Sequence, residues 1–211
     1  MNLPNTDELL SSQLFQIIKK VVEKSKIETY LIGGFVRDFL LQKKDSKDID
    51  IVAIGSGIEI AKLVQKELPN ASKIQVFKNY GTAMFKWRGV VLEFVGARKE
   101  SYSKESRNPI VEKGTLKNDQ NRRDFTINAL AISLNSTNFG KILDPFNGFD
   151  DIKNGIIKTP LDPNKTYSDD PLRMLRAIRF ATQLGFKIEE KSLNSIYENK
   201  DRIEIVSKER I

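Results

Sequence analysis

The stretch LIGGFVRD, residues 31–38, followed by DIDIV at residues 48–52, decides the fold of this chain. The residues before the two glycines are apolar and predict a short strand, and those after them predict a helix over 35–41. The second segment opens another strand, on which Asp48 and Asp50 share one face because side chains alternate along a strand.

Both segments carry groups that can bind ions. Free backbone N–H groups where the Gly33-Gly34 turn enters the helix attract phosphate, and Arg37 follows one helical turn later. Neighbouring carboxylates repel each other, and a divalent cation that neutralises them makes such a pair a metal site. Alone, each feature is also common in ordinary turns and at strand ends. Together they predict a triphosphate beside a metal site.

A third acidic residue completes the candidate metal site. Glu93 lies within VVLEFV, residues 90–95, an apolar strand in which a charge is costly unless it is paired or metal-bound. We therefore predict that Glu93 joins Asp48 and Asp50 as a ligand. The alternative is an outward-facing carboxylate on a strand with one wet face.

Composition limits the chemistry that this site can use. The 211 residues include neither Cys nor His, which excludes disulfide partners, thiolate ligands and imidazole bases. Any metal must therefore have oxygen ligands, which indicates Mg²⁺, with Mn²⁺ as the other choice. The net charge of +7 favours a polyanionic partner, although a solvated Lys-rich surface would give the same value.

The hydropathy pattern predicts an α+β protein. No apolar run approaches the roughly 20 residues that span a bilayer, so we expect no membrane partner and a cytoplasmic protein. Thr6 is predicted to cap a first helix with an apolar stripe through residue 22. The expected elements after the two opening segments are a helix over 58–68, strands over 73–77, 82–87 and 90–95, a mobile loop over 101–120, a helix or strand over 125–134, a turn at 144–148, and helices over about 170–183 and around 193–196. A break at 159–164 marks the predicted domain boundary, which gives domains 1–163 and 164–211.

Four ordered motifs resemble one family. They are residues 31–38 with Asp48-Ile49-Asp50, then EFVGAR at 93–98, RRDFTINA at 122–129 and DDPLRMLRAIRF at 169–180. Together they are similar to the class II branch of the polymerase β-like nucleotidyltransferases, which contains CCA-adding enzymes and bacterial poly(A) polymerases. The resemblance runs from about Tyr30 to the end of the chain.

The resemblance implies a fold and a reaction. The fold is a nucleotidyltransferase head with a small mixed sheet and flanking helices over 1–163, followed by an all-helical neck over 164–211. The reaction is addition of CMP and AMP from CTP and ATP to the 3′ end of tRNA, with two metal ions and release of pyrophosphate. The same motifs serve poly(A) polymerases and enzymes restricted to A or C. A catalytically inactive RNA-binding module is the alternative from another class.

Base selection can be derived from donors and acceptors. Asp170 and Arg173 lie at i and i+3 on one helix face, where a carboxylate accepts from an exocyclic amine and a guanidinium donates to a ring acceptor. Cytosine and adenine present that pair of groups, whereas guanine and uracil present the reverse. An exposed helical ion pair is the plain alternative.

The resemblance implies further nucleotide contacts. Arg176 and Arg179 continue this face toward phosphate or ribose, and Arg123 is predicted to contact the nucleotide in preference to Arg122. Each could instead be a surface arginine or touch the RNA backbone.

Two departures from the family pattern are visible. The family's reading helix usually begins Glu-Asp, whereas here it begins Asp169-Asp170, which shortens the reach of the first carboxylate. Full family members also continue into further helical domains, so we expect this chain to be a fragment of a longer protein.

Overall fold

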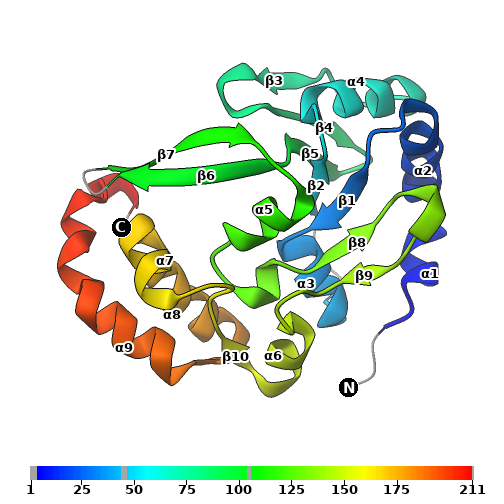
Figure 1. Cartoon of the computed structure of the whole chain (residues 1–211). Coiled ribbons are helices and arrows are strands. Elements are labelled where there is room, and N and C mark those ends of the chain that lie inside the picture. Colours follow the sequence, from blue (N-terminus) through cyan, green and yellow to red (C-terminus); the bar gives the residue numbers. More distant parts are fainter. Residues whose placement is uncertain (1–3, 44–46, 104–105, 211) are drawn as a thin grey trace.

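The computed structural model describes residues 4–43, 47–103 and 106–210. The fold is α+β, as predicted, and is built on a mixed seven-stranded sheet of order β3-β4-β5-β2-β1-β8-β9 (Figure 1). Its strands are β1 Thr29–Ile32, β2 Asp48–Ala53, β3 Gln75–Phe77, β4 Thr82–Trp87, β5 Val90–Gly96, β8 Ala131–Ser133 and β9 Ile142–Leu143. β2 and β5 are parallel, and the other neighbours are antiparallel. The predicted strands from 29–32 to 90–95 are confirmed to within two residues at each end.

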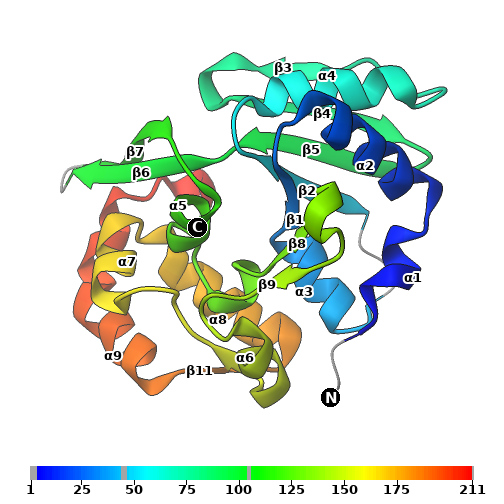
Figure 2. The same ribbon diagram turned by 45° about the vertical axis from the view of Figure 1, so that its right-hand side comes forward.

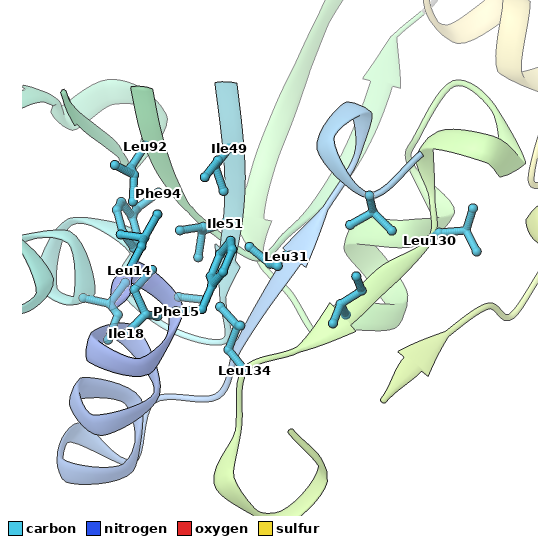
Figure 3. Packing of buried hydrophobic residues seen from close by; sticks show 14 of the residues in the cluster. Leu14, Phe15, Ile18, Leu31, Ile49, Ile51, Leu92, Phe94, Leu130 and Leu134 are labelled. Atoms are coloured by element: carbon cyan, nitrogen blue, oxygen red, sulfur yellow. The ribbon is translucent and has the colours of Figure 1, made fainter. Parts of the chain in front are cut away.

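Two helices cover one face of this sheet. α2 (Gln13–Ser25) and α4 (Gly57–Glu67) pack against it, and Leu14, Phe15 and Ile18 of α2 meet buried residues of β1, β2 and β5 (Figure 3). Alternation along β2 puts Ile49 and Ile51 in this core, so the acidic residues between and before them face the other way.

The first helix differs from the prediction. Asn5 caps the short α1 (Thr6–Leu10) by accepting from the backbone N–H of Asp7, whereas the hydroxyl of Thr6 donates to the carbonyl of Gly140. α2 then starts afresh after Ser12. The apolar stripe is real, but it belongs to two helices, because a stripe shows which face is buried and not where the backbone breaks.

The prediction of a loop over 101–120 is wrong. β6 (Arg98–Ser103) and β7 (Ser106–Lys113) form an antiparallel hairpin, and a capping box at Thr115 starts α5 (Leu116–Asn121). Ion pairs replace apolar packing here, since the nearly buried carboxylate of Glu100 contacts Arg98 and Arg122. The hairpin reaches from the end of β5 toward the C-terminal helices (Figure 2).

Residues 125–134, predicted as helix or strand, contain a 3₁₀ turn at Thr126–Asn128 and then β8. The turn signal at 144–148 leads into α6 (Gly148–Asn154), with Asn147 in the left-handed region at φ 57°. The break at 159–164 already contains the start of α7 (Pro163–Asp169).

The C-terminal part is mainly helical, although a two-residue strand at 187–188 departs from the predicted all-helical neck. Its helices are α7, α8 (Leu172–Leu184), α9 (Glu190–Asn199) and 3₁₀ turns at Lys200–Ile205 and Lys208–Arg210. β10 (Ile156–Ile157) pairs in parallel with β11 (Lys187–Ile188), so backbone hydrogen bonds cross the predicted boundary at 163/164, which stays a prediction. No helix in the described ranges is long and apolar enough to cross a membrane.

Phe94→Ala should lower the free energy of unfolding by about 3–5 kcal/mol, because the buried ring stacks on Phe85 and its loss leaves a cavity. Equilibrium unfolding in urea measures the change. Phe77→Ala is the control: this ring lies on edge strand β3 and is 43% exposed, so its removal should cost less than about 1 kcal/mol. Equal losses in the two variants would contradict the assigned core.

Candidate active site

Two of the predicted acidic residues lie side by side. Asp50 on β2 is directly opposite Glu93 on β5, and Asp48 is opposite Val91 two residues earlier. Burial raises the pKa of Asp50, while Arg123 lowers it and Asp48 raises it. Burial is also the main cause that raises the pKa of Glu93, and the charges of Asp50 and Asp48 raise it further. The charge of Asp48 therefore opposes ionisation of Asp50 and Glu93, and the charge of Asp50 opposes ionisation of Glu93.

Repulsion among these carboxylates bears on whether a metal ion fits the site. A hard divalent cation is suited to a set of oxygen ligands whose charges repel in its absence. Within the described ranges, however, no three acidic side chains already stand in metal-binding geometry, and Asp48 is exposed. The residues fit a cation in chemistry, and their assignment as its ligands stays a prediction.

Gly33 allows the turn to lie close to these acids. Its φ of +83° favours glycine, and a Cβ there would lie 2.9 Å from a guanidinium nitrogen of Arg123 and 3.0 Å from Oδ2 of Asp50. At Gly34, the first residue of α3 (Gly34–Leu40), a Cβ would make only ordinary contact with Arg37. The structure thus brings Gly33, Asp50 and Arg123 together. This contact requires that residue 33 has no side chain.

Asp119 holds the neighbouring arginines, and sequence reasoning missed it. Its fully buried carboxylate accepts from Arg122 at 2.9 and 2.6 Å through Oδ1, and from Arg123 at 3.1 Å twice through Oδ2. Burial alone would raise the pKa of Asp119, but Arg123 and Arg122 lower it below its usual value. The i, i+3 and i, i+4 spacing of these residues was the available signal.

Arg37 is embedded beneath the site. It is 8% exposed, donates to Asn128 at 2.8 Å and to Asp38 at 2.9 Å, and lies over the ring of Phe180. These contacts give Arg37 a structural role in fixing Asn128. Its predicted contact with a triphosphate stays a prediction.

The prediction that Asp170 and Arg173 share one helix face is wrong, because Asp170 lies in extended backbone after α7 and only Arg173 lies on α8. The two residues also bond to different partners. Asp170 pairs with Arg107 of β7, with Nε 2.9 Å from Oδ1. Arg173 donates to the backbone carbonyl of Arg122 at 2.8 Å and to the hydroxyl of Tyr102 at 3.2 Å. The i, i+3 spacing alone gave no sign of these partners from the hairpin and α5.

Arg176 and Arg179 separate in the structure. Arg176 pairs with Asp124, with an NH2-to-Oδ2 distance of 2.7 Å, whereas Arg179 is exposed. Burial opposes ionisation of Asp124, yet Arg176 and Asn128 keep its pKa below the usual value. The predicted ribose and phosphate contacts of both arginines are untested by this geometry.

Two cavities meet at Arg122. One is lined by Asp50, Tyr80, Thr82, Glu93, Val95, Arg98, Arg122, Arg123 and Arg210. The other is lined by Lys99, Glu100, Tyr102, Asn118, Asn121, Arg122, Leu161, Lys165, Thr166, Asp169 and Arg173. The acidic pair thus shares a cavity with cationic side chains, and the start of the reading helix lines the next cavity.

Comparison with known proteins gives a consistent relationship. Residues 29–158 match the family described as the poly A polymerase head domain. The chain is 42% identical over 162 residues to an A-adding tRNA nucleotidyltransferase of Aquifex aeolicus, covering 77% of this chain and 19% of the relative. It is 37% identical over 196 residues to a CCA-adding enzyme of Lactobacillus helveticus, covering 92% and 46%. The chain spans less than half the length of these two relatives.

Solved structures agree with this relationship. A CCA-adding enzyme in complex with CTP superposes with a TM-score of 0.81 and 32% identity, over all of this chain and 48% of that one. A tRNA nucleotidyltransferase complexed with a primer tRNA and an incoming ATP analogue has a TM-score of 0.75 and 34% identity, over 88% of this chain and 50% of that one. The resemblance read from the four motifs is confirmed.

Asp119→Asn should lower the free energy of unfolding by about 3 kcal/mol, because it removes the buried carboxylate that two partly buried guanidinium groups share and leaves Arg122 with Glu100 alone. Glu112→Gln is the control, since it removes only an exposed pair with Lys99 at 3.8 Å and should cost less than about 1 kcal/mol. Urea unfolding of both variants measures the difference.

The pH dependence has a defined sign. Because the pKa of Asp119 is lowered by folding, its stabilisation is complete above the ordinary carboxyl pKa of 3.8 and is lost as the pH falls through the lowered value. The gap between wild type and Asp119→Asn should shrink in that range. A gap that widens on acidification would contradict the ion-pair assignment.

Proposed function

Because this chain belongs to the poly A polymerase head domain family, we propose that it carries the catalytic site for template-independent addition of CMP and AMP, from CTP and ATP, to the 3′ end of tRNA. The observation that carries the proposal is Asp50 opposite Glu93, with Arg123 and the Gly33 turn beside them. This arrangement puts cation ligands next to groups that bind phosphate, which is what nucleotidyl transfer requires.

Asp48, Asp50 and Glu93 are the proposed ligands of two Mg²⁺ ions, with Mn²⁺ as a substitute. Mg²⁺ at such a site lowers the pKa of an attacking hydroxyl and neutralises charge on the leaving pyrophosphate. The rest of the chemistry falls to positioning by the chain. Since these 211 residues include no His, they supply no imidazole base.

Arg123 is the proposed triphosphate contact. Its Nε and NH2 are held by Asp119, which directs the remaining nitrogen toward Gly33 and the carbonyl of Asn128. An anchored guanidinium loses little freedom when it binds phosphate, so its charge is set in place before the substrate arrives. Gly33, Gly34 and Arg37 border the same turn, while Arg176 and Arg179 are proposed to assist from α8.

Asp170 and Arg173 are the proposed fork for the base edge. Asp170 would accept from the exocyclic amine of cytosine or adenine, and Arg173 would donate to the adjacent ring acceptor. Each now bonds to groups of the chain, so an incoming base must exchange with Arg107 at Asp170 and with Tyr102 at Arg173. Exchange of charge-assisted bonds penalises bases that cannot replace them, which supports rejection of guanine and uracil.

Addition of A alone is the second candidate, since an A-adding relative is 42% identical and a CCA-adding relative 37%. The proposed site serves either activity. Two tRNA substrates decide between them, one lacking the whole CCA end and one ending in CC, each with every labelled nucleoside triphosphate in turn. Incorporation of C on the first substrate supports CCA addition, and A on the second substrate alone supports A addition.

Asp50→Asn should reduce Mg²⁺-dependent nucleotide incorporation by roughly 10³-fold or more, because it removes a proposed ligand and its charge. The control Asp150→Asn changes an exposed acid on α6 and should keep wild-type turnover. Substantial turnover by Asp50→Asn in Mg²⁺, with its thermal unfolding unchanged, would refute the metal-site assignment.

Arg173→Ala should flatten the preference among CTP, ATP, GTP and UTP more than it weakens triphosphate binding, because its proposed partner is the base edge. Arg123→Ala should weaken binding of all four triphosphates. Incorporation profiles and binding titrations on both variants separate these effects. Identical nucleotide profiles for the two variants would contradict the assignment of Arg173 to the base edge and Arg123 to the triphosphate.

A further inference from the structure

The sheet face that bears the acidic residues extends past them to the edge of the sheet. Residues directly opposite one another in neighbouring strands have side chains on the same face. Glu93 is paired with Met84, Val95 with Thr82, and Thr82 in turn with Phe77. Phe77 on β3 therefore lies on the same face as Glu93 and Asp50, two strands away from Glu93 and three from Asp50.

This face is more apolar than an ordinary wet sheet face. The alternate residues Ala83, Phe85, Leu92 and Phe94 fill the core, as expected for the covered side. On the other side, Met84 and Val91 are half-buried, Val95 packs against a second apolar cluster that contains Val52, and Thr82 is buried, whereas Phe77 at the sheet edge is 43% exposed. An accessible apolar strip beside a charged site indicates a surface that receives a ligand.

Tyr80 extends the strip to the acidic pair. It ends the 3₁₀ turn Lys78–Tyr80 between β3 and β4 and is 69% exposed. Gly81, at φ +62°, closes this turn, and Thr82 donates to the carbonyl of Tyr80 at 3.3 Å. Tyr80 lines the same cavity as Asp50 and Glu93. A fixed turn thus presents an exposed aromatic ring to the cavity of the proposed reaction.

The charges around this strip suit a nucleic acid backbone. Lys86 lies on the open face through its pairing with Val91, Lys78 is in the turn of Tyr80, and Arg98 lines the cavity. Exposed aromatic rings with interspersed cations are the usual means of holding single-stranded nucleic acid without reading its sequence.

We propose that Phe77 and Tyr80 form a stacking platform for the last unpaired bases of the RNA 3′ end, which holds the terminal hydroxyl at Asp50 and Glu93. This inference rests on the proposed function. Addition of C and then A produces RNA ends with different terminal bases, so the group that holds the end must tolerate different bases, and an aromatic face does so. The incoming nucleotide is served by Arg123 in the same cavity and by Asp170 and Arg173, of which Arg173 lines the neighbouring cavity.

The test uses the 211-residue chain and a fluorescent RNA hairpin with a four-nucleotide 3′ overhang. Tyr80→Ala and Phe77→Ala should each weaken binding of this RNA by roughly tenfold. Tyr80→Phe should bind as wild type, because the ring is retained. Tyr197→Ala, which removes a 72% exposed ring on the remote α9, is the matched control and should bind as wild type.

Further readouts separate the platform from a general defect. A blunt hairpin should bind wild type and both alanine variants equally, and Mg²⁺-dependent binding of CTP and ATP should be unchanged. In the transfer reaction, KM for the overhang RNA should rise roughly tenfold in both variants, with KM for the nucleotide unchanged.

Three results would overturn either the platform or the proposed function. An active wild type whose RNA affinity and KM are unaltered in Tyr80→Ala and Phe77→Ala would overturn the platform and leave the proposed function standing. A different result would overturn the function and retain the platform. In that case the wild type transfers no nucleotide, Tyr80→Ala and Phe77→Ala bind the overhang RNA more weakly than wild type, and Tyr197→Ala binds it as wild type does. Equal losses in all three alanine variants would overturn the platform.

Discussion

Asp119 has no exposed side-chain surface, and each of its carboxylate oxygens accepts hydrogen bonds from one arginine. This shared ion pair sets the directions of Arg122 and Arg123, which leave α5 toward two cavities. Arg122 also pairs with Glu100, whereas Arg123 brings its positive charge next to Asp50 and lowers the pKa of that carboxyl. Asp119 therefore determines where positive charge lies in the cavity, although it does not line that cavity.

The opposing charges explain why the turn before α3 has its sequence. Burial raises the pKa of Asp50, the charge of Asp50 in turn raises the pKa of Glu93, and Arg123 must come close to lower the pKa of Asp50. A Cβ at residue 33 would stand between Asp50 and Arg123, at 3.0 and 2.9 Å. Glycine at that position is therefore an electrostatic requirement as well as a backbone one, because it lets opposite charges approach across the turn.

Short-range patterns in the sequence predicted the sheet well. Alternation along β2 and β5 correctly assigned Ile49 and Ile51 to the core, because one buried face leaves a period of two. The hairpin β6–β7 was missed because its support is ionic: Glu100 and Arg107 bond to partners far along the chain, Arg122 and Asp170. Local spacing likewise put Asp170 and Arg173 on one helix face, whereas Asp170 lies before α8 and tertiary contacts give each residue a separate partner. The platform residues Phe77 and Tyr80 became visible only through strand register.

The small parallel pair of β10 and β11 limits where this polypeptide can be cut. Ile157 is fully buried, and its carbonyl accepts from the backbone of Glu189 at 3.0 Å, beyond α8. A shorter chain ending at the predicted boundary would lose this partner, leave an open strand edge and uncover the isoleucine, which is a surface prone to self-association. An independently expressed head should therefore include residues through at least 189. During synthesis, the chain must likewise extend beyond the sheet-bearing region before this strand edge is paired.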